Sequence, residues 1–530
     1  MQALEDSLWS LKFAGAAGIP GWCEDTTRAI AEHFAAFAQA RIAPLDGPGD
    51  LQGCRLVEGR VTLPDGFADT CRDLAEAGWL GLAAPEEFDG QGQGAAVQAV
   101  VSEIFSGACH SLQMIVGLVP GAIRLLRQAA SPDQQARFIP ELASGNWLAT
   151  MCLTESDAGS DLSRIRTRAL NTAQGWRISG EKIFISGGDQ DASANILHLV
   201  LARTGPEGTR GLSLFACPAI LDDGQRNAVS VARIEEKMGL HGSPTCHMIF
   251  DNAEAELIGA PGQGLAAMFE LMNHARLDVA LQGVAHAAKA HAIARDYAAI
   301  RKQGRAPDGS AAVLAEHPDV ARMLADMDRR TLAARALAHA ALVALETGAH
   351  DLTEFLTPMA KVAGSNAGIR VTETAMQVLG GYGYLHEYRL EQAYRDARIC
   401  AIYEGANGIQ ALTLATRCLS HAGGAQARAF AEYIGQVAQA HPQSPVAQAL
   451  ADWDALCDHV GKAPAHMAEY LMQGSIALAE LAFWQRVSTD CRDDARLQAL
   501  ASDARHHALH DLRSSLHFAT LRAIPAPEPA

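Results

Sequence analysis

The 530-residue sequence lacks the features of a cross-linked or metal-binding protein. Its 11 cysteines are an odd number, scattered and never arranged as C-x-x-C, which argues against both a disulfide framework and a zinc knuckle. Two histidines one helical turn apart, His506 and His510, have too little carboxylate or cysteine support for a metal site. We therefore expect no metal and a reducing compartment, the cytoplasm.

Positive charge is also scarce. Lys and Arg number 43 against 60 Asp and Glu, which gives a formal net charge of −17. Nucleic-acid affinity comes mainly from Lys and Arg that displace counterions, so we expect no nucleic-acid partner. The first residues, MQALEDSLWSLKF, lack the basic and apolar regions of a signal peptide, and we find no apolar run as long as a membrane span.

What the chain does contain is enough apolar surface for a large core, with 49% hydrophobic residues. Helical spacing of apolar residues predicts a helical domain at 1–150, and short β-rich segments between turn residues predict a β domain at 151–262. Long alanine-rich segments predict a helical bundle at 263–420, and 421–530 is predicted to be a helical extension with a loose Pro-rich tail. The fold expected is mainly α with a central β domain.

Two short motifs lie near the domain junctions. MCLTESDAGSDL begins the β domain, and IYEGANGIQ places Glu404 between an aromatic ring and a glycine. The order of motifs and domains resembles the acyl-CoA dehydrogenase flavoproteins over roughly residues 74–419. The added tail, together with EKMGLHGSPTC and MNHARLDVALQGV, is most similar to the extended branch that includes methylthiopropionyl-CoA dehydrogenases. This resemblance implies N-terminal helices, a middle β-barrel domain and a C-terminal helical bundle.

The resemblance implies that Glu404 is a catalytic base. In this family the base removes the proton next to a thioester carbonyl while a hydride leaves the next carbon for N5 of FAD, giving a trans-2-enoyl-CoA. A carboxylate among Ile402, Tyr403, Gly405 and Ala406 is poorly solvated, which strengthens it as a base. The residues alone leave a second role open for Glu404, a cap of the following helix, because acids favour helix N-termini.

The resemblance also assigns residues to FAD and to the acyl-CoA substrate. Around FAD it implies Leu153, Thr154, Gly159, Ser160, Phe184, Ser186, Arg301, Gln377, Gly380, Gly381, Ala406 and Asn407. Around the substrate it implies Ser160, Asn273, Arg276, Tyr403 and Gly405. The family commonly has Thr in place of Ala406 and an acid in place of Asn273. We therefore expect one FAD hydrogen bond, worth roughly 1 kcal/mol, to be missing, and a charged substrate contact at Asn273 is not implied.

Several of these residues have a structural alternative. Phe184 fits the core of a strand, Arg276 fits a buried ion pair, and Arg301 fits a solvated helix end. By itself, MCLTESDAGSD also fits an ordinary turn. The glycines of QVLGGYGYLHEY do not form a dinucleotide fingerprint, because no strand precedes them and no acid follows at the required interval.

The implied activity is FAD-dependent α,β-desaturation of an acyl-CoA, with electrons passed to an electron-transfer flavoprotein. FAD sites shared between subunits imply a homo-oligomer, a dimer or a dimer of dimers. Alternatives with the same fold are a methylthiopropionyl-CoA dehydrogenase and an acyl-CoA oxidase. A non-catalytic alternative is a DNA-binding flavoprotein that uses the C-terminal extension, against which the acidic composition counts.

Overall fold

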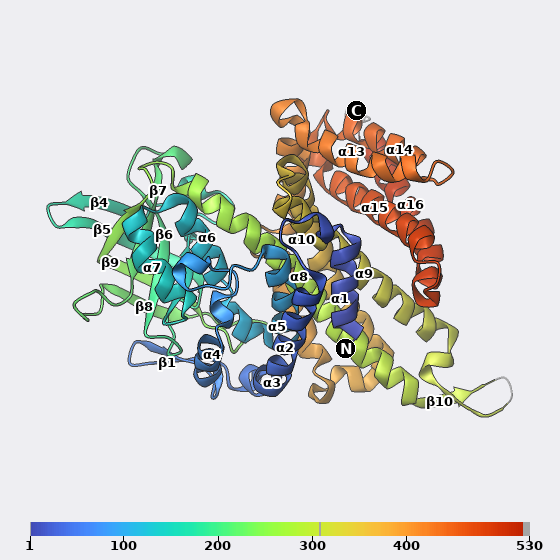
Figure 1. Cartoon of the computed structure of the whole chain (residues 1–530), viewed down its shortest axis with the longest axis horizontal. Coiled ribbons are helices and arrows are strands. Elements are labelled where there is room, and N and C mark those ends of the chain that lie inside the picture. The colour runs from blue at the N-terminus through green and yellow to red at the C-terminus, as the bar shows by residue number, and fades with distance from the viewer. Residues whose placement is uncertain (1, 307–308, 523–530) are drawn as a thin grey trace, which may run out of the picture. The chain divides into compact units, whose positions relative to one another are not determined.

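The computed structural model describes residues 2–306 and 309–522, apart from the side chain of Glu270, so the predicted loose tail lies outside the described residues. The chain forms two units, Met1–Arg28 with Arg276–Ala530, and Ala29–Ala275. The element order of helices, strands and helices that the sequence predicts is confirmed (Figure 1). The division into four segments stays a prediction.

Helices and one closed sheet make up the unit Ala29–Ala275. In its helical part, the Phe34 ring lies 4.8 Å from Trp79 and 5.6 Å from Phe105, between ring centroids. The helix Ala95–Val116 is long and apolar enough to cross a membrane by length and composition alone, and the sequence analysis missed it. In the structure, 78% of its most apolar 18-residue window is buried in the protein. The helices are α2 (Glu24–Phe37), α3 (Ala43–Gln52), α4 (Phe67–Glu76), the central α5 (Ala95–Val116), α6 (Val119–Ala129) and α7 (Pro132–Ala143).

Seven strands form the sheet of this unit. They are β3 (Trp147–Cys152), β4 (Arg168–Thr172), β5 (Gly175–Ser186), β6 (Asn195–Arg203), β7 (Leu212–Pro218), β8 (Val229–Ile234) and β9 (Thr245–Ile258). The pairing runs β6-β4-β5-β9-β7 and returns from β7 to β6, while β3 adds to β6 and β8 adds to β9. Because the pairing path closes on itself, the sheet is the predicted middle β barrel.

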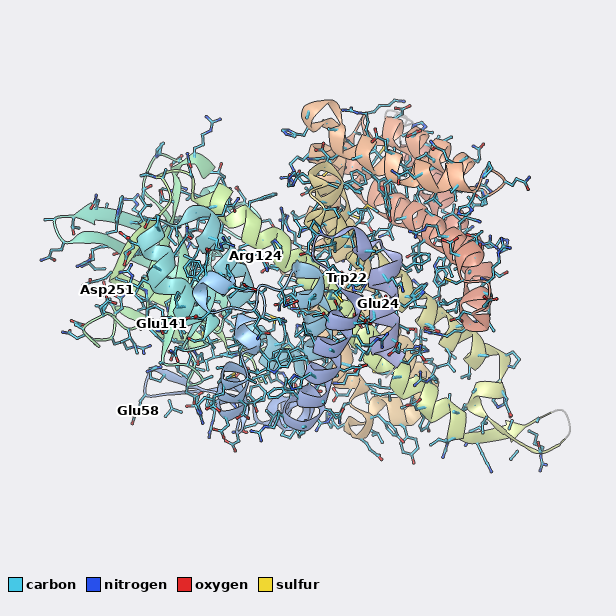
Figure 2. All side chains as sticks on the ribbon, in the orientation of Figure 1. Trp22, Glu24, Glu58, Arg124, Glu141 and Asp251 are labelled. Atoms are coloured by element: carbon cyan, nitrogen blue, oxygen red, sulfur yellow. The ribbon has the colours of Figure 1, made fainter. Side chains whose placement is uncertain are left out.

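A short hairpin of β1 (Arg55–Val57) and β2 (Arg60–Thr62) also belongs to this unit. Its turn has positive φ at Glu58 (50°) and Gly59 (78°), as a two-residue hairpin turn requires. Figure 2 shows Glu58 at the tip of the hairpin.

The other unit is built on long helices and one small hairpin (Figure 1). Its first helix, α1, packs against α9, and the three helices α14, α15 and α16 pack against one another. The elements are α1 (Gln2–Phe13), α8 (Gly264–Ile300), β10 (Lys302–Arg305), β11 (Ala311–Val313), α9 (Pro318–Glu346), α10 (His350–Leu379), α11 (Leu390–Arg398), α12 (Asn407–Thr413), α13 (Ala425–Ala440), α14 (Val446–Val460), α15 (Pro464–Asp490) and α16 (Ala495–Arg522). The boundaries between the units fall within α2 and within α8.

Helices α8 and α10 cross at glycines. A Cβ atom on Gly283 would lie 2.2 Å from the carbonyl oxygen of Gly364, and one on Gly364 would lie 2.3 Å from the carbonyl oxygen of Ala280. The two backbones can approach this closely only because both glycines lack a side chain. This crossing brings residues of α8 and α10 to the chain segment 403–407.

The predicted helical extension is confirmed and is tied to α1 by charge. Arg496 on α16 donates to Asp6 on α1 over 2.8 Å and to Asp328 on α9 over 2.6 Å. Farther along the extension, the buried Trp453 indole donates to the Ser475 hydroxyl over 2.8 Å. A partly buried arginine shared by two carboxylates fixes the extension to the helices of its own unit.

Candidate active site

Glu404 lies in a strained turn just before α12. Its φ is 53°, in the left-handed region that non-glycine residues rarely adopt, and the φ of Gly405 is 85°. The side-chain amide of Gln410 donates to the carbonyl oxygens of Glu404 (3.1 Å) and Gly405 (3.2 Å). A Cβ atom on residue 405 would lie 2.4 Å from that amide nitrogen. The turn therefore needs glycine at 405 and is held by Gln410.

The carboxylate of Glu404 does not cap α12. The N-cap residue of that helix is Ala406, and its side chain makes no capping hydrogen bond. Among the described residues, none donates a hydrogen bond to the Glu404 carboxylate, nor does any accept one from its backbone N–H. The strained backbone thus presents a carboxylate that has no structural hydrogen bond to satisfy.

Burial makes this carboxylate a stronger base. Burial is the main reason that the pKa of Glu404 is raised from 4.5 to about 7, and the nearby Asp278 charge raises it further. The positive charges of Arg276 and Lys361 lower this pKa but do not outweigh burial. Arg276, on α8, also donates from Nε to the carbonyl oxygen of Glu404 over 3.4 Å. A general base works best when its pKa lies near the working pH. Glu404 meets that condition.

Tyr403 is fixed by a polar chain on α8. Its hydroxyl donates to Oε1 of Gln282, and the amide nitrogen of Gln282 donates to Asp278 over 3.0 Å. Burial raises the pKa of Tyr403 well above 10, so the ring hydroxyl stays neutral. The predicted substrate residues Arg276, Tyr403 and Gly405 thus gather around Glu404.

Asn407, predicted to bind FAD, uses its side chain inside the protein. Its Oδ1 accepts from the buried Lys361 ammonium over 2.9 Å, and its Nδ2 donates to Ser365 (3.0 Å) and Asn366 (3.2 Å), all on α10. Sequence reasoning missed Lys361, whose signal was a lone lysine in an apolar helical stretch. Because its side chain is engaged in these bonds, Asn407 could contact a cofactor only through its backbone.

In the unit Ala29–Ala275, the predicted FAD residues Leu153 and Thr154 follow β3 directly. The carbonyl oxygen of Leu153 accepts from the ammonium of Lys182 over 2.8 Å, and that of Thr154 accepts from the Ile183 backbone N–H over 2.9 Å. Lys182 also pairs with Glu155 over 2.8 Å. The loop is therefore fixed to β5.

The end of β5 carries two more predicted FAD residues. Phe184 has a φ of 60° and an exposed fraction of 60%, so it is not the core residue that its sequence also allowed. The hydroxyls of Thr154 and Ser186 have no hydrogen-bond partner among the described residues. An exposed aromatic face with two unengaged hydroxyls in the same unit suits a planar, polar-edged ring.

The remaining predicted residues of this unit lie on irregular segments and on α8. Gly159 and Ser160 follow Glu155 in the loop after β3, and a Cβ atom on Gly159 would meet nothing within 4 Å. Asn273 lies on α8, one turn before Arg276. The open space at Gly159 leaves room for a ligand to approach the backbone.

A second group of predicted FAD residues lies elsewhere on the helical unit. The guanidinium of Arg301 lies 5.7 Å from the ring centroid of Tyr382, in the turn that follows α10. Added Cβ atoms on Gly380 and Gly381 of that turn would meet nothing within 4 Å. Along α10, Gln377 is about 24 Å from Lys361 at the usual helical rise. This group is therefore a surface separate from the Glu404 turn.

Comparison with known proteins identifies the family. The sequence matches the acyl-CoA dehydrogenase N-terminal domain at residues 24–146, the middle domain at 150–253 and the C-terminal domain at 262–419. It is 42% identical over 431 residues to the 3-methylmercaptopropionyl-CoA dehydrogenase of Ruegeria pomeroyi, a match that covers 77% of this chain and 73% of that protein. The chain belongs to the acyl-CoA dehydrogenase family.

Solved structures of this family share the fold. Butyryl-CoA dehydrogenase from Megasphaera elsdenii superposes with a TM-score of 0.66 at 26% identity, covering 75% of this chain and 99% of that chain. An acyl-CoA dehydrogenase from Bacillus anthracis, solved in complex with FAD, gives a TM-score of 0.77 at 21% identity, covering 96% of this chain and 90% of that chain. The second likeness extends the shared fold into the C-terminal extension.

Acyl-CoA dehydrogenases are FAD-dependent oxidoreductases that act on CH–CH bonds, and the residues present here fit FAD. In the unit Ala29–Ala275, the exposed Phe184 ring and the hydroxyls of Thr154 and Ser186, which have no hydrogen-bond partner among the described residues, suit the flavin ring. The acyl-CoA dehydrogenase resemblance expected from the sequence, its fold, its cofactor and its class of reaction are thus confirmed.

Proposed function

We propose that Glu404 is the base with which this chain oxidises the Cα–Cβ bond of an acyl-CoA thioester to a trans-2-enoyl-CoA. The observation that carries the proposal is the strained, half-buried turn in which the Glu404 carboxylate accepts no hydrogen bond from the described residues and burial raises its pKa to about 7. Carboxylates with structural roles are normally hydrogen-bonded or capping, and this one is neither. A carboxylate so placed can take up a proton.

In this mechanism Glu404 removes the proton from the carbon next to the thioester carbonyl. The backbone N–H of Glu404, without a partner among the described residues, is suited to donate to the thioester oxygen as negative charge develops there. Arg276 holds the turn through its bond to the Glu404 carbonyl oxygen. FAD, when bound, supplies the acceptor for the hydride that leaves the β-carbon.

For the substrate we propose a short acyl-CoA with a sulfur atom in its acyl chain. The support is the relative from Ruegeria pomeroyi, which is named for 3-methylmercaptopropionyl-CoA and is 42% identical. For the electron acceptor we propose an electron-transfer flavoprotein, with molecular oxygen as the alternative of an acyl-CoA oxidase.

The test is the visible spectrum of the purified FAD-loaded protein without oxygen, before and after addition of acyl-CoAs. The panel contains short, medium and long straight chains and a short thioether chain. We expect the thioether substrate to bleach the flavin band fastest. Bleaching by straight chains alone would overturn the substrate class, and no bleaching by any member would overturn the activity. Reoxidation by air as fast as by an electron-transfer flavoprotein would favour the oxidase.

We further propose that the chain acts as a homo-oligomer in which Arg301, Gln377, Gly380 and Gly381 contact the FAD of a neighbouring copy. The support is their separation from the Glu404 turn along α10 and the open backbone of their turn. Arg301→Ala should leave the oligomer intact in sedimentation but release FAD more readily. Unchanged FAD retention would contradict this role. A DNA gel shift at low salt tests the non-catalytic alternative, for which we expect no shift.

A further inference from the structure

We propose that Lys361 is a positioning residue whose buried ammonium stabilises the ionised form of Glu404, and that Asn407 holds the ammonium in place. The inference rests on Glu404 as the base and names a charge that, together with Arg276, opposes the effect of burial on its pKa. Lys361 has an exposed fraction of 0% and lies on α10, one turn before the glycine crossing with α8. Its ammonium is thus withdrawn from water at the point where the helices meet the Glu404 turn.

Within the described part of the chain, the Lys361 ammonium makes one hydrogen bond, and that bond goes to a neutral group. Nζ donates to Oδ1 of Asn407 over 2.9 Å, and Asn407 is itself held by Ser365 and Asn366. A buried cation is costly unless a negative charge lies near it, and an amide oxygen supplies none. Asn407 therefore fixes where the ammonium lies, and the compensating charge must come from another residue.

Several ionisable groups act on this part of the fold. From α8 come the guanidinium of Arg276, which lowers the pKa of both Lys361 and Glu404, and the carboxylate of Asp278, which raises the pKa of Glu404. The Cys400 thiol lies beside Lys361, but burial raises its pKa to about 12, so it is neutral at physiological pH. Glu404 is then the carboxylate, among the described groups acting on Lys361, that favours its charged form.

The charges of the two residues oppose the effect of burial on each other. Burial lowers the pKa of Lys361 and raises the pKa of Glu404, whereas the Glu404 charge raises the former and the Lys361 charge lowers the latter. Because the two charges are opposite, each favours the ionised form of the other. The ammonium therefore helps Glu404 to be ionised, and so able to accept a proton, although burial disfavours its charge.

A purely structural role for Lys361 makes a different prediction, and a set of variants separates the two. Lys361→Met removes both charge and hydrogen bond, whereas Lys361→Gln removes the charge and keeps a donor for Asn407. Lys361→Arg restores the charge. Ser365→Ala is the matched control, because it removes one hydrogen bond of Asn407 and keeps the Lys361 charge, its bond to Asn407 and the bond from Asn407 to Asn366.

The main readout needs no substrate. The infrared band of the protonated Glu404 carboxyl group is identified as the band that disappears in Glu404→Gln. The intensity of this band is then followed against pH in each FAD-loaded variant, which gives the pKa of Glu404. Both uncharged variants should raise the pKa of Glu404 by about one unit, as expected for the loss of one nearby opposite charge. Lys361→Arg and Ser365→Ala should leave that pKa within about 0.3 units of wild type, although Ser365→Ala costs stability. An unchanged pKa in Lys361→Gln would overturn the proposal, even if Lys361→Met fails to fold.

A second readout is the pH dependence of flavin reduction by acyl-CoA. The uncharged variants should be about fivefold slower than wild type at pH 7 and equal to it near pH 9.5, because the ionised fraction of Glu404 recovers. A deficit of constant size at every pH would mean misplacement of the turn and would contradict the proposal. If instead Glu404→Gln is still reduced at the wild-type rate, the proposed function fails whatever the infrared titration gives.

Discussion

Lys182 and Lys361, the two lysines that are fully buried among the described residues, show how the same side chain is used in two ways. Lys182 pairs directly with Glu155, whose carboxylate also accepts from the backbone N–H groups of Arg166 (2.6 Å) and Thr167 (3.0 Å). Lys361 is bonded to the neutral amide of Asn407. The difference lies in the hydrogen bonds that each neighbouring carboxylate receives.

Those hydrogen bonds determine what each carboxylate can do. Burial raises the pKa of Glu155, but the Lys182 charge and the hydrogen bonds outweigh burial, and the pKa stays below its ordinary value. Glu404 receives no hydrogen bond from the described residues, so burial prevails and its pKa is raised to about 7. A fully bonded carboxylate holds a loop, whereas an unbonded one is free to exchange a proton.

The largest stability effect expected is for Lys182→Met. Removal of one partner of a buried ion pair strands the other charge and typically costs about 3–5 kcal/mol. In Lys361→Met, the matched variant, the group that loses its hydrogen bond is the neutral amide of Asn407 and not a carboxylate. We therefore expect the free energy of unfolding to fall by only about 1 kcal/mol. Urea unfolding with an unchanged m-value measures both losses. Equal losses for the two variants would remove the distinction between these lysines.

A somewhat smaller effect, with opposite sign, is expected for Glu404→Gln. The raised pKa means that the folded protein holds this proton more tightly than the unfolded chain does. The native state is therefore favoured below about pH 4.5 and loses this advantage as the pH rises through 7. Above pH 8 the variant should be more stable than wild type by roughly 3 kcal/mol, and the gain should shrink toward acidic pH.

Chemical denaturation at several pH values checks this second prediction. The neutral amide has no proton to lose, so the difference between the variant and wild type must depend on pH. A difference that is the same at pH 5.5 and pH 8.5 would show that Glu404 is not desolvated as described. Glu155→Gln is the matched contrast, because loss of its ion pair with Lys182 should destabilise the protein at both pH values.

The smallest effect is expected for Thr154→Val in the loop that Lys182 holds. Loss of one hydroxyl contact should weaken FAD binding by about 1 kcal/mol, roughly fivefold in Kd, without a change in unfolding free energy of the apoprotein. Fluorescence titration of the apoprotein with FAD measures it. Thr209→Val, at an exposed site of the same unit, should bind FAD as wild type does. Equal binding by Thr154→Val would remove this residue from the cofactor site.

The sequence predicted the order of helices and strands and the position of Glu404, because both depend on patterns that are local in the chain. It did not identify Lys361, because the role of this lysine arises where Gly283 and Gly364 let two helices approach. It likewise missed the pair of Lys182 and Glu155, which forms between β5 and the loop that follows β3. Contacts of this kind depend on tertiary packing, which spacing along one chain does not encode.

The sequence also did not indicate the ion pair between Arg496 and Asp6, which joins the two ends of the chain. Arg496 donates hydrogen bonds to Asp6, which lies 490 positions earlier in the chain, and to Asp328. Nothing local distinguishes this arginine from the other arginines of the extension. In contrast, the role of Phe184 was left open by the sequence, and its positive φ and exposed ring ruled out a core position.

The most direct test of the central claim is the rate at which acyl-CoA reduces the FAD-loaded protein after rapid mixing without oxygen, followed from pH 5.5 to 9. For wild type we predict a rate that rises about tenfold per pH unit below pH 7 and levels off above it, as the pKa of Glu404 requires. For Glu404→Gln we predict unchanged acyl-CoA binding and reduction at least about a thousandfold slower at every pH. A wild-type rate without this pH dependence, or a variant reduced at nearly the wild-type rate, would contradict Glu404 as the base.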